Sequence, residues 1–220
     1  MLFFTTRMKN NTLLMILVVA VAFVAGYFII KKTPAPTPTP QIVDTTPKPA
    51  PLLTEKYVDP VYHFSLNYDL PFTIASSDVL ENSSWSNNSA APGQKLVMVV
   101  ISRDFMPKTN FSEALISVGV SQDKSAVKDC LIATNGETAA GTVVIGGTTF
   151  TKLAFNDAAA GNLYDTTMYR TIKGSSCFSL ESIIHTTNIG AYDPSQGITA
   201  FDKSKIDTLV APAVNSFKFL

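Results

Sequence analysis

Two cysteines, Cys130 and Cys177, are the side chains best suited to covalent chemistry in this 220-residue chain, and it contains no others. In an oxidising compartment they could form a disulfide. In the chain-entropy description, closing a loop of this length would stabilise the folded state by about 4 kcal/mol. The alternative is a pair of buried free thiols that act as small apolar side chains. The residues are far apart in sequence and form no C-x-x-C motif, which argues against a redox-active pair. We therefore predict a structural disulfide.

The histidines, His63 and His185, are the next candidates for chemistry. Glu181 and His185 would share one face of a strand over 176–186, and Tyr169 and Arg170 lie on the strand before it. A cross-strand Glu–His–Arg cluster could bind an anion or transfer a proton. The alternative is an ordinary polar pairing at the sheet surface. If the cluster does transfer protons, the protein would be a small extracytoplasmic hydrolase or redox enzyme that uses His185 and Glu181.

The single tryptophan, Trp85, lies in a segment over 76–94 that is rich in Ser, Asn, Ala, Pro and Gly. An aromatic side chain on an exposed loop is a candidate for contact with a partner. It could equally fold back and cover the edge of the core, which is the interpretation that we favour.

Motifs that would identify a metal, nucleotide or serine-hydrolase site are absent from the sequence. Three or four His, Cys, Asp or Glu residues at zinc spacing cannot be assembled. Gly-x-Ser-x-Gly, phosphate-binding loops, Rossmann glycines and EF-hand loops are missing as well. We predict no cofactor and no metal, and the sequence reveals no catalytic residue.

The elements that must position these residues follow a long apolar segment, residues 12–30, which has no charged residue and no proline. Its length matches the roughly 20 residues that cross a bilayer as a helix, and a secretory signal peptide would have a shorter apolar core. We predict a cytoplasmic tail over 1–11, an uncleaved transmembrane anchor over 12–30 and a Pro/Thr-rich stalk over 31–52. The globular domain, 53–220, should then be extracytoplasmic on a single-pass membrane protein.

The charge of this domain limits its partners. The chain has 17 basic and 17 acidic residues, and the first 52 residues hold five of the basic ones and one acidic one. That leaves 12 basic against 16 acidic residues in the domain, a net charge of −4. Nucleic acid and anionic lipid surfaces both require clustered Lys and Arg, so neither is an expected partner.

Alternating and continuous apolar patterns predict an α+β domain with an antiparallel sheet. Expected strands occupy 64–68, 96–101, 111–121, 142–145, 148–155, 163–172 and 176–186, and Gly146-Gly147 should form a tight hairpin turn. Helices are expected over 123–133 and from 203 to about 214, where Pro212 should kink or end the helix. We expect both helices to pack on one face of the sheet.

Two segments make the chain resemble PsbP-like domains. Tyr62–Tyr68 reads YHFSLNY, close to the Y-x-F-S-x-x-Y-P opening of that family, with Asp69-Leu70 where proline often follows. The segment from Phe201 to Phe219 is similar to the family's last helix and its S-F-x-F ending. The resemblance covers most of 57–220 and implies a PsbP-like sandwich in an accessory or binding subunit, with no reaction and no functional residues to carry over.

The leading hypothesis is therefore a membrane-tethered extracytoplasmic module that binds a protein or an envelope component. The enzyme built on His185 and Glu181 is the alternative. A binding module should expose an apolar or aromatic patch on the sheet face and the 76–94 segment, whereas the enzyme should have a concave pocket around its titrating residues.

Overall fold

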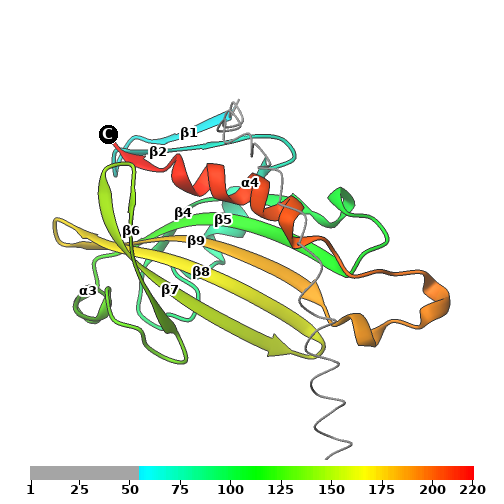
Figure 1. Ribbon diagram of the computed structural model, residues 1–220. Helices are drawn as coiled ribbons and strands as arrows, with labels where there is room; N and C mark the ends of the chain where they lie inside the picture. The colour runs from blue at the N-terminus through cyan, green and yellow to red at the C-terminus, as the bar shows by residue number, and fades with distance from the viewer. Residues whose placement is uncertain (1–54) are drawn as a thin grey trace, which may run out of the picture. The chain divides into compact units, whose positions relative to one another are not determined.

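The computed structural model describes residues 55–220 (Figure 1). The predicted tail, transmembrane anchor and stalk, residues 1–52, lie outside the described residues. Within residues 55–220, no helix has the length and apolar character needed to cross a membrane.

A seven-stranded antiparallel sheet organises the described part of the chain, with the strand order β3-β4-β5-β9-β8-β7-β6. Its three longest strands have 12 residues each and are consecutive in the chain. The strands are β3 (Thr73–Ile74), β4 (Gln94–Ser102), β5 (Phe111–Ser121), β6 (Thr138–Ile145), β7 (Thr148–Ala159), β8 (Asn162–Lys173) and β9 (Ser176–Thr187).

A second layer covers one face of this sheet. It consists of α4 (Lys203–Asn215) and a three-stranded sheet in the order β1-β2-β10, formed by β1 (Glu55–Asp59), β2 (Phe64–Tyr68) and β10 (Lys218–Phe219). The main core lies between the layers, where Phe64 and Phe217 from the small sheet's side meet Phe178 and Leu180 of β9. The closing segment after α4 therefore returns to the small sheet, where β10 pairs with β2.

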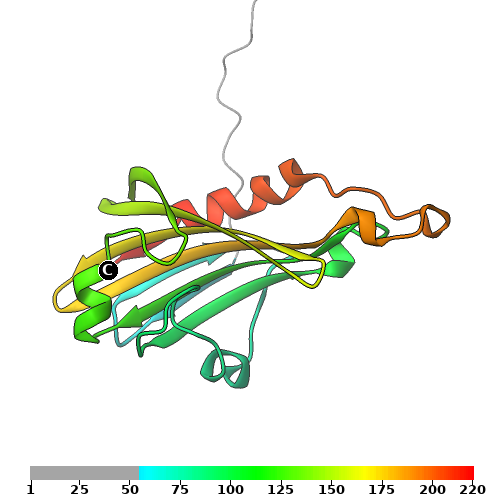
Figure 2. The ribbon, with the colours of Figure 1, turned by 90° about the horizontal axis from the view of Figure 1, so that it is seen from below.

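The opposite face of the large sheet has a different and smaller cover. It consists of the short helix α3 (Lys124–Asp129) and part of the connection between α2 (Ser77–Glu81) and β4. Trp85, Ala126, Cys130 and Cys177 form a separate buried cluster there. Figures 1 and 2 both show α3 and α4 apart, with strands of the large sheet between them.

The prediction that the helices pack on one face is thus wrong for α3. Residues of β9 alternate, so Phe178 and Leu180 face α4 while Cys177 faces α3, and the disulfide places α3 on the side of Cys177. The α+β class and the antiparallel sheet are confirmed.

Three local predictions also differ from the structure. The helix expected over 123–133 ends at Asp129, and Leu131 beyond its end is 44% exposed and does not continue the buried face. The early end that was one of the two expectations for Pro212 does not occur, since α4 continues to Asn215, close to the predicted end at about 214. The segment predicted as loop, 76–94, contains the helical turn α2 at its start. Three short 3-10 turns complete the described elements, at Arg103–Phe105, Ile189–Ala191 and Pro194–Gln196.

Candidate functional site

The connection over residues 82–93, here called the Trp85 loop, lies flat on the large sheet on the face opposite α4. Two glycines permit this close approach, because a Cβ at Gly119 of β5 would overlap the carbonyl group of Trp85, and one at Gly93 would overlap the indole ring. The indole Nε1 donates to the carbonyl of Ala91 at 3.0 Å, which folds the ring into its own loop. Trp85 is consequently 4% exposed, so it covers the sheet and is not presented as a free aromatic patch.

A fully buried carboxylate, Glu181 of β9, fixes the middle of the Trp85 loop to the sheet. Its Oε1 accepts from Ser86 Oγ at 2.6 Å and from Ser179 Oγ at 2.8 Å, and the backbone N–H of Asn87 donates to the same carboxylate at 3.0 Å. Lys95 Nζ of β4 lies 3.5 Å from Glu181 Oε2 and donates to Ser117 Oγ at 3.1 Å. A buried charge of this kind persists only when it is paired and fully hydrogen-bonded, as it is here.

A second buried ion pair lies beside the first. Arg170 of β8 donates from Nη2 to Glu137 Oε1 at 2.6 Å and from Nη1 to Glu137 Oε2 at 3.1 Å. Nη2 also donates to Ser86 Oγ at 3.2 Å, so one hydroxyl connects the two ion pairs. Arg170 Nε is buried and has no hydrogen-bond partner among residues 55–220.

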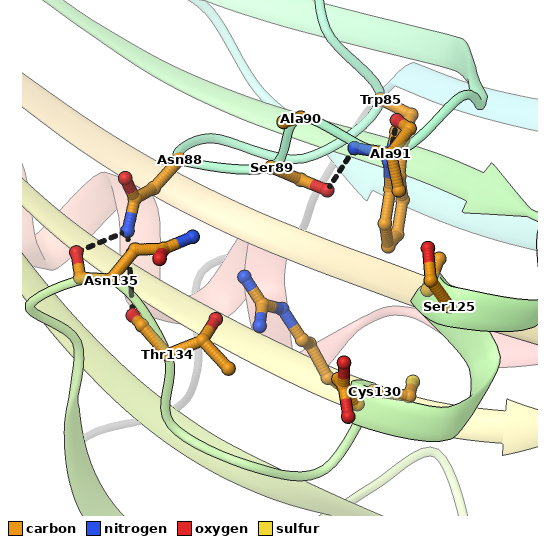
Figure 3. A pocket seen from close by; sticks show the side chains of 12 residues that line it. Trp85, Asn88, Ser89, Ala90, Ala91, Ser125, Cys130, Thr134 and Asn135 are labelled. Carbon is orange, nitrogen blue, oxygen red and sulfur yellow. Dashed lines mark hydrogen bonds between the residues drawn. The ribbon is translucent and has the colours of Figure 1, made fainter.

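A cavity of about 250 Å³ opens between the Trp85 loop, α3 and the turn before β6 (Figure 3). Its walls carry polar side chains beside an aromatic ring and small apolar residues. They are Trp85, Asn88, Ser89, Ala90, Ala91, Ser125, Ala126, Asp129, Cys130, Thr134, Asn135 and Arg170.

Two asparagines connect the walls of this cavity, as Figure 3 shows. Asn88 and Asn135 both have left-handed backbones, with φ of 63° and 50°, a conformation that Asn tolerates better than most residues. Asn88 Nδ2 donates to the backbone carbonyl of Asn135 at 2.7 Å. This bond joins the Trp85 loop to the turn before β6.

The predicted disulfide joins Cys130, directly after α3, to Cys177 of β9. Cys130 also lines the cavity, so the covalent bond holds one wall against the sheet. The cavity is therefore held by a disulfide, two buried ion pairs and a carbonyl-to-amide bridge.

Three of the five predicted binding residues, Trp85, Arg170 and Glu181, meet at this place. Tyr169 does not, because neighbouring residues on a strand point to opposite faces, and it packs against the core on the α4 side. Its burial there raises the pKa of the Tyr169 hydroxyl.

His185 is also outside the cavity, at the other end of β9. Its Nε2 lies 2.9 Å from Asn162 Oδ1, its Nδ1 lies 3.4 Å from Glu113 Oε1, and its ring stacks on Tyr164 with centroids 4.4 Å apart. It lies four positions along the strand from Glu181, a span of about 13 Å. The predicted Glu–His–Arg cluster is therefore divided, with His185 on its own.

The other residues of the site were not predicted from the sequence. Ser86 and Asn87 belong to the S-W-S-N-N-S segment, in which Trp85 alone was a predicted binding residue, and neither Lys95 nor Glu137 lies in a recognisable motif. The one usable signal was the charge of Lys95 directly before the apolar run of β4.

The geometry of Ser86 does not suit nucleophilic attack. Ser86 is fully buried under its own loop, and its hydroxyl is engaged by Glu181 and Arg170. A nucleophile needs access to the reacting carbon and a base within reach. Within the described residues, no three His, Cys, Asp or Glu side chains are grouped so that they could hold a metal ion.

No family model and no curated protein matches this sequence. Among solved structures, a Bacteroides thetaiotaomicron protein is similar over 70% of this chain, with 14% identity and a TM-score of 0.35, and the match covers 50% of its own chain. LpqN of Mycobacterium tuberculosis, a protein involved in cell envelope biogenesis, is similar over 70% of this chain and 82% of its own, with 11% identity and a TM-score of 0.28.

Proposed function

We propose that this protein is a non-catalytic binding module outside the cytoplasmic membrane, anchored by residues 12–30 and spaced by the stalk over 31–52. Its task would be to capture an envelope component or the exposed part of an envelope protein. The observation that carries this proposal is the cavity between the Trp85 loop, α3 and the turn before β6, whose walls are held by buried bonds and which is open to a ligand.

The disulfide supports the extracytoplasmic location. Disulfides persist in oxidising compartments and are rare in the cytosol, where thiols are kept reduced. Cys130 and Cys177 are the chain's entire set of cysteines, and both are used in the bond.

The rigid walls support binding over catalysis. Ligand sites are usually preformed and concave, with a few fixed polar groups beside apolar ones, because a preformed site loses less freedom on binding. Here Arg170 and Glu181 have the partners that fix them, whereas neither has the access or the neighbouring base that a reaction requires.

A PsbP-like relationship belongs to the same proposal. The two segments that carry the resemblance, β2 and β10, pair with each other in the small sheet. Ser216 Oγ donates to the Asn67 carbonyl at 2.9 Å, and the N–H of Leu220 donates to the His63 carbonyl at 2.7 Å. Such mutual support would explain why the opening and closing motifs occur together.

Retention on envelope material tests the function directly. The full chain, purified in a mild detergent with its disulfide intact, should be retained by the insoluble envelope fraction of its own cells. Ala90→Phe places a ring at the exposed wall of the cavity and should abolish retention. Ala159→Phe, at the exposed end of β7, is the matched control and should be retained like the wild type. Equal retention of both variants would contradict the proposed site.

A further inference from the structure

We infer that β6 is an assembly surface on which a second copy of this chain pairs, so that two large sheets join edge to edge. The inference goes beyond the proposed function and makes no use of the cavity at the Trp85 loop. β6 is the last strand of the large sheet and pairs only with β7. Among residues 55–220, no backbone–backbone hydrogen bond outside the β6–β7 ladder involves β6. Its outer side therefore presents N–H and C=O groups that a further strand would satisfy.

The other strand edges of the described residues are protected against such pairing, and β6 is not. β3 and β10 have two residues each, and β1 carries Glu55, Lys56 and Asp59. Short length and charged side chains are common means by which proteins keep an edge from pairing with another chain. β6 has eight residues, and its hairpin with β7 contains no charged side chain over 138–151.

The backbone groups that face outward belong to Thr142 and Val144. A two-residue turn follows Ile145, and the pair of residues that flanks such a turn is hydrogen-bonded. Bonded and non-bonded pairs alternate along an antiparallel ladder, so Thr142 and Val144 do not bond across to β7 and their N–H and C=O groups point away from it. A bulge between Ala139 and Thr142 interrupts the ladder, so the regular edge begins at Thr142.

The side chains of this edge are complementary to those of a second copy. Val144 is 66% exposed, and Thr142 is exposed on the same face. With a two-fold axis at Val143, Thr142 of each copy would lie opposite Val144 of the other, and each such pair would exchange two backbone hydrogen bonds. Thr and Val are both β-branched and uncharged, so these cross-strand pairs are favourable and no like charges meet. Both copies use the same surface, so the assembly closes as a dimer.

The hairpin is fixed in position before it pairs. Val143 packs against the main core and Ile145 is buried. The tip lies against the end of the chain, where a Cβ at Gly146 would overlap the carbonyl oxygen of Phe217 (Figure 1). A preformed edge loses little freedom on pairing. The edge is short, so we expect weak association between free molecules and stronger association where a shared membrane concentrates the copies.

Crosslinking in cells that express the full chain tests this pairing. Thr142→Cys supplies the only free thiol, because Cys130 and Cys177 are joined. The two substituted positions would be diagonal neighbours about 7–8 Å apart, within reach of a short, cell-permeant bismaleimide. We expect a crosslinked product of twice the mass of the chain. Ala159→Cys, at the exposed far end of β7, is the matched control and should give only background.

Second substitutions in the Thr142→Cys chain test the edge itself. Val144→Pro removes the outward N–H and leaves the bonds to β7, and Val144→Lys places a charge on each copy at the contact. Each should lower the yield of the crosslinked product by about tenfold, since both copies lose the same interaction. Val58→Lys, at an exposed position of β1, should leave the yield unchanged. Unchanged Trp85 emission in all three checks that the fold is intact.

Three results would overturn the inference. The first is a yield from Thr142→Cys no higher than that from Ala159→Cys. The second is a yield that neither Val144→Pro nor Val144→Lys lowers. The third is a product of any other mass, which would assign the edge to a strand of a different protein. None of them bears on retention by the envelope fraction, which tests the cavity through Ala90→Phe.

Discussion

Glu181 is the residue on which the candidate site depends most. Its carboxylate is fully buried, and its partners come from β4, β9 and the Trp85 loop. Removal of one member of such a pair leaves the other charge buried without compensation, which typically costs about 3–5 kcal/mol.

We expect Glu181→Gln to lower the free energy of unfolding by an amount of this size, measured by urea denaturation with Trp85 fluorescence as the probe. Glu113→Gln, whose carboxylate is partly exposed, is the control and should cost less than 1 kcal/mol, as is usual for exposed pairs. The double change Glu181→Leu with Lys95→Met should cost less than the sum of its two parts, because no buried charge remains. Additive losses would show that Lys95 and Glu181 are not coupled.

At this scale the sequence located two charged residues but not their partners. Glu181 and Arg170 were predicted to form a cross-strand cluster with His185, and each instead belongs to a separate buried ion pair. Their partners could not be found, because Ser86 is 95 residues from Glu181 and Glu137 is 33 residues from Arg170 in sequence. The cross-strand link to His185 failed since a shared face on one strand does not imply contact over four residues.

Gly119 is the point at which two elements, β5 and the Trp85 loop, touch. A methyl group there would overlap the Trp85 carbonyl, so Gly119→Ala should lift the loop off the sheet. We expect a red shift of Trp85 emission as the indole gains solvent, and a loss of about 1–3 kcal/mol in stability, the usual cost of overpacking. Gly190 lies in an exposed turn, and a Cβ added there would have ordinary space around it. Gly190→Ala should therefore change neither the Trp85 emission nor the stability. An unshifted emission spectrum in Gly119→Ala would contradict this placement of the loop.

The disulfide joins Cys130, directly after α3, to Cys177 of β9, and the two cysteines are 47 positions apart in sequence. Replacing both cysteines by serine should cost about 4 kcal/mol of stability if chain entropy governs the effect. Reductant should lower the unfolding temperature of the wild type to that of the double variant and leave the variant itself unchanged. A wild type that is indifferent to reductant would show that the bond contributes nothing to stability.

Strand β1 is linked to the large sheet by Tyr57, and this link should make the fold sensitive to alkali. The Tyr57 hydroxyl lies 3.2 Å from both the Leu96 carbonyl oxygen and Asp59 Oδ2, and these two acceptors share its single proton. Burial, followed by the charge and hydrogen bond of Asp59, raises the pKa of Tyr57 to about 12. The folded state thus favours the neutral phenol, so its contribution is complete below pH 10 and is lost as pH rises through 12.

Unfolding temperature measured between pH 8 and pH 12 should therefore fall more steeply for the wild type than for Tyr57→Phe. Some slope should remain in the variant, because burial also raises the pKa of Tyr68 and Tyr169. Identical slopes in the two proteins would contradict a role for Tyr57.

The residues described between 55 and 220 form one layered body, and its layers were only partly predictable. Period-two patterns located the long strands, because burial of alternate side chains is a local property of sequence. The distribution of covering elements between the two faces of the large sheet is not a local property of the sequence. It depends on the disulfide between Cys130 and Cys177 and on the fit of the Trp85 loop at Gly119, neither of which leaves a periodic signal.

The location of the whole molecule is the premise behind its proposed role, and reporter cysteines can test it. Ala159→Cys, at the exposed end of β7, should react with a membrane-impermeant maleimide in intact spheroplasts. Thr5→Cys, in the tail predicted to be cytoplasmic, should react only after lysis. The reason is that residues 12–30 would place the two positions on opposite sides of the bilayer. The reverse pattern would put the disulfide-bonded domain in the reducing cytosol, where Cys130 and Cys177 would not stay joined, and would remove the basis for envelope binding.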